Sequence, residues 1–202
     1  MKKISLVVFV CMTVLVAQAQ TVAKTKMLGG GILYSSSKQT DYMDATTKQS
    51  EYSIIPSFGY FVKDKIAVGV NVGYVGGKSE GGFSNTVKES GFVAGPFVRA
   101  YAHTSNNSLA VYGQFSVLLG SGKRTTESGA ASTDIKNSDL DIALAPGLAY
   151  FFNQHWAFEL GFRGISYAKN DPNKDLDNDE VSSFAIGLNS LLPSTLGFRY
   201  HF

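Results

Sequence analysis

Apolar and polar residues alternate in several stretches of the chain after its first 20 residues. In a strand, successive side chains point to opposite faces, so strict alternation predicts a strand with one apolar face. The segments 66–74, 109–119 and 156–163 show the pattern most clearly. In the first of these, the apolar face carries Ile66, Val68, Val70, Val72 and Tyr74, and the other face carries small residues and Asn71.

Stretches of this strand character are separated by runs of Gly, Ser, Asn, Asp and Lys. We expect eight strands, at about 25–36, 51–62, 66–77, 90–103, 108–120, 139–152, 156–168 and 183–202. The connections alternate between short ones (63–65, 104–107, 153–155) and long ones (37–50, 78–89, 121–138, 169–182). Short periplasmic turns, long outside loops and an even strand number are typical of outer-membrane barrels.

The expected fold is therefore all-β, an eight-stranded antiparallel up-and-down transmembrane β-barrel. Ten strand residues at ~3.4 Å each, tilted by ~40°, rise about 26 Å, close to the ~25 Å apolar band of such barrels. Because a proline has no N–H for the ladder, we expect local irregularity at Pro56, Pro96 and Pro146. The first and fourth strands do not alternate cleanly, so the pattern does not define their register.

The start of the chain predicts export. Lys2 and Lys3 precede an apolar run from 4 to 17, and Ala17 and Ala19 are the small residues that a signal peptidase requires. We expect a signal peptide over 1–19, a barrel domain over 20–202, and a location in the outer membrane of a Gram-negative type of cell. The only cysteine, Cys11, would leave with the signal, and no basic surface remains to suggest nucleic-acid binding.

The last eight residues form another alternating strand that ends on an aromatic residue. Thr195, Gly197, Tyr200 and Phe202 resemble, position by position, the C-terminal signal that the barrel assembly machinery reads. The resemblance implies assembly machinery and outer-membrane lipid as partners.

Three segments resemble the small outer-membrane β-barrel domain family, akin to the membrane domain of outer-membrane protein A. They are Ser57–Gly69, Gly95–Arg99 and Gly197–Phe202, and the resemblance extends over 25–202. It implies fold and location, but it does not specify an activity, because fold alone does not determine function.

Charged residues on the inward face must be paired, because an eight-stranded barrel has room inside only for side chains. Alternation directs six such residues into the lumen: Glu51, Arg99, Asp141, Glu159, Arg163 and Arg199. We expect a network of lumen salt bridges, with a switchable proton or ion path as the alternative.

No catalytic, cofactor or metal site is expected. All three histidines, His103, His155 and His201, fall at the periplasmic end of the expected barrel. A Ser-His-acid arrangement at the outer-leaflet lipid would therefore lack its base. The acidic loop 170–180 lacks the Gly and the final Glu of a calcium loop, and Gly120–Thr125 lacks two positions of a phosphate-binding loop.

The sequence thus predicts a monomeric integral outer-membrane protein with a packed polar lumen and a structural or surface-contact role through its outer loops. Two alternatives remain open: a narrow channel for ions or small solutes, and an exported soluble ligand-binding barrel with its apolar face turned inward.

Overall fold

The computed structural model describes residues 21–40, 46–81, 85–105, 108–129, 131–174, 180–187 and 193–202, so the expected signal peptide lies outside the described residues. Within these ranges, no helix is long and apolar enough to cross a membrane. The strands are β1 (Lys26–Thr40), β2 (Thr46–Lys63), β3 (Ile66–Glu80), β4 (Asn85–His103), β5 (Leu109–Ser128), β6 (Ala131–Phe151), β7 (Trp156–Gly161), β8 (Ile165–Asp171), β9 (Val181–Ile186) and β10 (Thr195–His201).

The strands form one antiparallel sheet that closes on itself. Each of β1 to β6 pairs with the strand that follows it in sequence. The ring then closes because β7 pairs with β10 and β10 pairs with β1. β7 and β8 both pair with β6 and are two parts of one pass of the chain, as are β9 and β10. The prediction of an all-β up-and-down ring is confirmed, with the last two passes interrupted.

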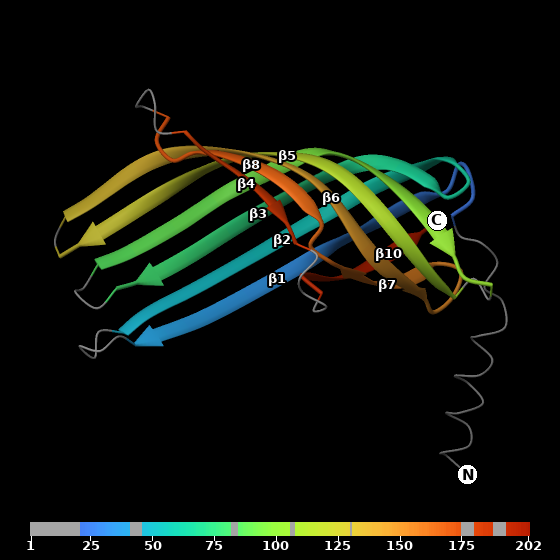
Figure 1. Cartoon of the computed structure of the whole chain (residues 1–202), viewed down its shortest axis with the longest axis horizontal. Coiled ribbons are helices and arrows are strands. Elements are labelled where there is room, and N and C mark those ends of the chain that lie inside the picture. The colour runs from blue at the N-terminus through green and yellow to red at the C-terminus, as the bar shows by residue number, and fades with distance from the viewer. Residues whose placement is uncertain are drawn as a thin grey trace, which may run out of the picture.

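Most of the expected long loops are strands instead. The β1–β2 pairing continues to Thr40 and Thr46, and the β5–β6 pairing continues to Ser128 and Ala131. The sequence does not show this, because these outer parts are polar on both faces and carry no apolar alternation. We call the outer parts of β1 to β6, residues 35–40, 46–51, 76–80, 85–91, 120–128 and 131–139, the outer arms; they extend to the left in Figure 1.

The three prolines interrupt the sheet as predicted. The β2–β3 ladder skips the positions of Ile55 and Pro56, and the β4–β5 ladder skips Gly95 and Pro96. Beside Pro146 the effect is larger, since Gly147 pairs with Gly161 whereas Leu144 pairs with Ile165. One extra residue is therefore accommodated between β7 and β8, which is a β-bulge.

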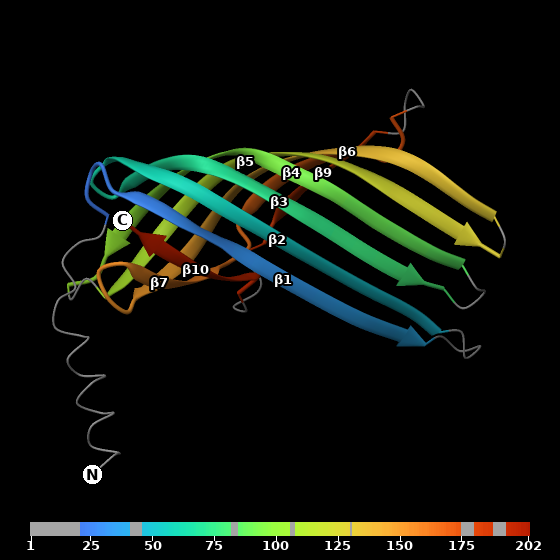
Figure 2. The ribbon, with the colours of Figure 1, turned by 180° about the vertical axis from the view of Figure 1, so that it is seen from behind.

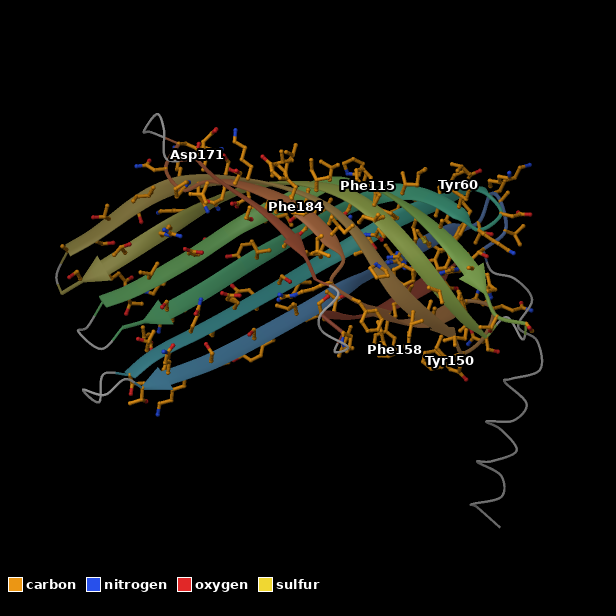
Figure 3. The ribbon with its side chains drawn as sticks, in the orientation of Figure 1. Tyr60, Phe115, Tyr150, Phe158, Asp171 and Phe184 are labelled. Atoms are coloured by element: carbon orange, nitrogen blue, oxygen red, sulfur yellow. The ribbon has the colours of Figure 1, made fainter. Side chains whose placement is uncertain are left out.

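The outer surface of the ring is an apolar belt, and the inner surface is buried. Exposed aromatic and aliphatic side chains point away from the lumen, as Tyr60, Phe115, Tyr150 and Phe158 do in Figure 3. The buried core lies inside the ring near the short turns. This distribution fits a barrel that faces lipid on its outside, since a soluble protein would leave so many large apolar side chains in water at a cost.

Among the described residues, the ring closes only toward the short turns. In the described part of the chain, β1 pairs with β10 from Met27 to Ile32, and beyond Ile32 it pairs with β2 alone. β9 pairs only with β8. Figures 1 and 2 show the outer arms as a curved sheet that extends beyond β7 and β10.

Candidate functional site

Three charged side chains from strands far apart in the sequence meet inside the barrel. Glu159 on β7 contacts Arg99 of β4 (Oε1 to Nη1, 2.7 Å) and Arg199 of β10 (Oε1 to Nε, 2.8 Å). A second bond joins Arg199 Nη2 to Glu159 Oε2 at 3.0 Å. All three residues are at most 5% exposed. We call these three residues the lumen charge cluster.

The strand registers explain how the cluster forms. On β10, Gly197 lies opposite Glu159 of β7, so Arg199 is the diagonal neighbour of Glu159 on the same inward face. Arg99 reaches the same carboxylate from β4, which is separated from β7 by β5 and β6 in the ring. A strand-to-strand contact and a contact across the lumen thus converge on one carboxylate.

Polar and aromatic neighbours complete the coordination of both guanidinium groups. Gln114 Oε1 accepts hydrogen bonds from Arg99 Nε (2.8 Å) and Nη2 (2.6 Å), and the Tyr112 ring centre lies 4.1 Å from Arg99 Cζ. Ser57 Oγ accepts from Arg199 Nη1 at 3.0 Å. Such bonds to planar guanidinium groups are strong and directional, so the cluster and its neighbours link five strands, β2, β4, β5, β7 and β10.

Packed aromatic side chains fill the lumen on the periplasmic side of the cluster. The Phe61 ring centre lies 5.8 Å from Tyr101 and 5.8 Å from His201, and Phe151 lies 5.5 Å from His201. Met27 and Phe97 are also buried there. We call this layer, Met27, Phe61, Phe97, Tyr101, Phe151 and His201, the aromatic floor.

The other charged residues that alternation directs inward do not join the cluster. Glu51 is exposed in the outer arms, where it accepts a hydrogen bond from Gln49 (3.0 Å), and Asp141 is half-buried on β6. The inward direction expected for Arg163 is corrected by the structure, because this residue is exposed. It lies within the bulge between β7 and β8, where one extra residue reverses the alternation.

The residues of the expected assembly signal lie at the closing seam of the ring. Tyr200 and Phe202 point outward with ring centres 5.8 Å apart, and Tyr200 also lies 5.0 Å from Trp156. Phe202 exchanges two backbone hydrogen bonds with Lys26, at 2.7 and 2.9 Å. Thr195 begins β10, and Gly197 is buried against the backbone of β1. Whether the machinery reads these residues stays a prediction.

Sequence reasoning missed two cavities on the outer side of the cluster. The larger, of about 360 Å³, is lined by polar residues of the outer arms, and the smaller, of about 230 Å³, has the lumen charge cluster among its lining residues. Alternation alone could not reveal them, because it gives the direction of a side chain but not the space around it. The acidic positions 175–179 of the calcium-like loop lie outside the described residues.

The sequence matches the outer membrane protein β-barrel domain family over residues 4–189. The chain belongs to this family. Its location is therefore the outer membrane.

Solved structures of similar fold include the N-terminal barrel domain of OprF from Pseudomonas aeruginosa, at 12% identity, TM-score 0.45, and coverage of 89% of this chain and 98% of that one. Ail of Yersinia pestis, in complex with sucrose octasulfate, is 14% identical with a TM-score of 0.44, covering 90% and 99%. OprG of Pseudomonas aeruginosa is 15% identical with a TM-score of 0.43, covering 92% and 99%. No curated relative matches the chain.

Proposed function

We propose that this protein is a non-conducting surface-contact protein whose outer arms form its working surface. The observation that carries the proposal is the continuous pairing of the outer arms, through which β1 to β6 continue as one sheet beyond the apolar belt. Strands of 15 to 21 residues exceed the ~10 needed to cross the membrane at the usual tilt. The excess length makes a firm surface rather than a set of loose loops.

Exposed ion pairs link neighbouring strands of this surface. Arg124 Nε on β5 lies 2.5 Å from Glu89 Oε1 on β4, and Lys123 Nζ lies 2.7 Å from Asp134 Oδ2 on β6. Hydrogen bonding from Lys123 and from Thr125 lowers the pKa of the Asp134 carboxyl. Each exposed pair contributes little stability, but the pairs place charges of both signs on a continuous sheet, and a polar surface of this kind is suited to recognition.

The lumen charge cluster and the aromatic floor support the non-conducting part of the proposal. Both lie across the lumen between the cavities and the periplasmic end, and the side chains that form them are buried. A monomeric barrel of this kind needs only outer-membrane lipid and, during insertion, the assembly machinery as partners.

The first experiment measures conductance of the purified protein in planar bilayers. We expect no single-channel steps for the wild-type protein. Reproducible steps would contradict the proposal and favour the narrow channel, and a rise in conductance on Glu159→Gln would identify the cluster as its gate.

The second experiment tests whether the outer arms mediate adherence to surfaces and to other cells. A variant in which residues 37–49 are replaced by a two-residue turn removes the outer arms of β1 and β2, and a variant with 122–136 replaced in the same way trims β5 and β6. Each is displayed on host cells that lack the protein, and adherence to polystyrene and autoaggregation are measured. We expect both trimmed forms to lose the adherence conferred by the wild-type protein. Equal adherence at equal surface level would contradict a contact role for the outer arms.

A further inference from the structure

The outward face of the sheet repeats one order of side chains in each of β1 to β6. The last large apolar residue of the belt is followed, two positions further from the membrane, by a serine or glycine, and after two more positions by an exposed lysine. The six triplets are Tyr34–Ser36–Lys38, Tyr52–Ser50–Lys48, Tyr74–Gly76–Lys78, Phe92–Ser90–Lys88, Leu119–Ser121–Lys123 and Leu140–Ser138–Lys136. We call the six lysines the lysine collar.

Aromatic residues of these triplets mark the outer edge of the apolar belt. The ring centres of Tyr52 and Tyr74 are 6.0 Å apart, and those of Tyr74 and Phe92 are 5.2 Å apart. Such aromatic girdles lie at the boundary between hydrocarbon and head groups. Four residues at ~3.4 Å each, tilted by ~40°, rise about 10 Å beyond this edge, and a long lysine side chain can reach back toward it. The collar is therefore at the level of the outer head groups.

The collar consists of three pairs of lysines that lie directly opposite each other across a ladder. The pairs, one in each of the first three hairpins, are Lys38 with Lys48, Lys78 with Lys88, and Lys123 with Lys136. Like charges directly opposite each other destabilise a sheet, because their Cβ atoms are only about 5 Å apart. An anion between the two ammonium groups of each pair removes this cost.

Carboxylates on the same outward face lie further from the membrane than the lysines. In each ion pair of this face, the acid is two positions further out than its lysine, on the same strand or on the neighbouring one. The pairs are Lys78 with Glu80, Lys88 with Glu127, Lys123 with Asp134 and, on β8 and beside β9, Lys169 with Glu180. Asp171, labelled in Figure 3, likewise lies two positions beyond Lys169.

Positive charge is in excess on the outward face of the described outer arms. The six lysines of the collar share this face with Glu80, Glu127 and Asp134, whereas the other charged residues of the outer arms face inward; these are Glu51, Glu89, Arg124 and Asp139. Lys78 also borders the larger cavity, but its ammonium group bonds to Glu80. Among the described residues, no ion pair is found for Lys38, Lys48 or Lys136, although Lys48 lies opposite Glu80.

We propose that the lysine collar binds the phosphate groups of outer-leaflet lipid head groups. One phosphate lies between the two lysines of a pair, the serine hydroxyls nearer the membrane supply further donors, and the carboxylates stay beyond it. Ammonium and hydroxyl groups both donate to phosphate oxygens, and the small residues leave room for a head group above the belt. The occupant is a lipid because the collar is continuous with the lipid-facing belt. The proposal does not depend on the contact role of the outer arms.

The test follows backbone amide NMR signals of the isotope-labelled protein in phosphatidylcholine nanodiscs as phosphatidic acid is added in steps. We expect the amide signals of the collar, and of the small residues beneath it, to shift. Oleate, which brings negative charge to the bilayer without a phosphate, should shift them less. Shifts as large with oleate would overturn the proposal in favour of surface charge alone, and equal shifts with dissolved inorganic phosphate would overturn it in favour of a free-phosphate site. Collar signals that do not move with phosphatidic acid would also overturn it.

Lys38→Gln combined with Lys48→Gln removes one pair and leaves the other two in place. A lysine near an anionic membrane surface strengthens binding about fivefold, so we expect the half-maximal amount of phosphatidic acid for the β1–β2 amides to rise more than about tenfold. The amides of Lys123 and Lys136 should be unaffected. Lys63→Gln combined with Lys65→Gln is the matched control, since it removes the same charge at the short turn between β2 and β3. An unchanged half-maximal amount in the first variant would overturn the proposal.

A second variant keeps the net charge and the ion pair but reverses their order. Lys78→Glu combined with Glu80→Lys moves the ammonium group two positions away from the membrane. We expect the shifts at Gly76 and Ser90 to be lost while those of the β1–β2 hairpin remain. Wild-type shifts at Gly76 and Ser90 in this variant would show that the position of the lysine does not matter, and would overturn the proposal.

Discussion

Glu159 is the only carboxylate that bonds to Arg99 and Arg199 in the described structure, so two buried cations depend on one anion. An isolated buried charge is costly, and removing one partner of a buried ion pair typically costs about 3 to 5 kcal/mol. The carboxylate therefore determines the stability of the barrel more than any single exposed ion pair does.

We predict that Glu159→Gln lowers the free energy of unfolding by about 3 to 5 kcal/mol, because both guanidinium groups lose their counter-charge. Urea unfolding in lipid vesicles, followed through the fluorescence of the single tryptophan, Trp156, measures the change. Glu51→Gln is the matched control, since Glu51 is exposed, and we expect it to stay within about 0.5 kcal/mol of the wild type. Equal unfolding free energies for the two variants would show that the cluster contributes nothing net.

Sequence alternation predicts only part of the lumen charge cluster. Alternation places Arg99, Glu159 and Arg199 on the inward face, and the structure brings these three together. Alternation cannot show that Arg99 crosses the lumen, because that depends on ring closure and on the stagger of the strands. It also misplaces Arg163, because one bulge residue reverses every direction that follows it.

At the level of strands, glycines opposite large side chains allow the sheet to hold inward aromatic residues. Tyr112 on β5 pairs directly with Gly147 on β6, and a Cβ at Gly147 would overlap the Tyr112 ring. That ring also stacks on Arg99, so the glycine supports the cluster indirectly.

We predict that Gly147→Ala destabilises the barrel by about 1 to 3 kcal/mol, because Tyr112 must move off its place over Arg99. Gly113→Ala is a control on the same pair of strands, since a Cβ there meets nothing within 4 Å. Resistance of the folded, heat-modifiable gel band to rising temperature compares the two variants. A Gly147→Ala band as heat-resistant as that of Gly113→Ala would contradict the role given to this pair.

The strand boundaries show where sequence patterns stop being informative. Inside lipid one face must be apolar, so the alternation locates residues such as 66–74 and 109–119 correctly. Beyond lipid neither face is constrained, and the 121–138 segment reads as a loop although 121–128 and 131–138 are paired strands. Backbone hydrogen bonding, which the sequence does not display, extends these strands.

For the whole molecule, the seam between the first and last strands completes the ring. Met27 to Ile32 pairs with Leu196 to His201, and Phe202 bonds to Lys26. We predict that deletion of Phe202 reduces the amount of protein inserted in the outer membrane, because it removes the final aromatic of the expected assembly signal and the last seam bonds.

Membrane fractionation and the heat-modifiable band measure this loss, with Phe152→Ala as the control. Phe152 is an exposed aromatic, 44% exposed against 51% for Phe202, but it lies outside the seam. Normal insertion of the truncated protein would contradict the signal interpretation. An equal loss of inserted protein for Phe152→Ala would show instead that insertion depends on exposed aromatic residues in general and not on the seam.

The pairing of Lys26 with Phe202 also has a consequence for biogenesis. Residues that become neighbours at the seam are far apart in the chain, so hairpins such as β1–β2 can pair locally, but the ring cannot close until β10 is present. Contacts between residues this distant in sequence form slowly. Until they form, the apolar faces of the strands are exposed and can aggregate. The closing seam is therefore the last pairing that the ring can complete.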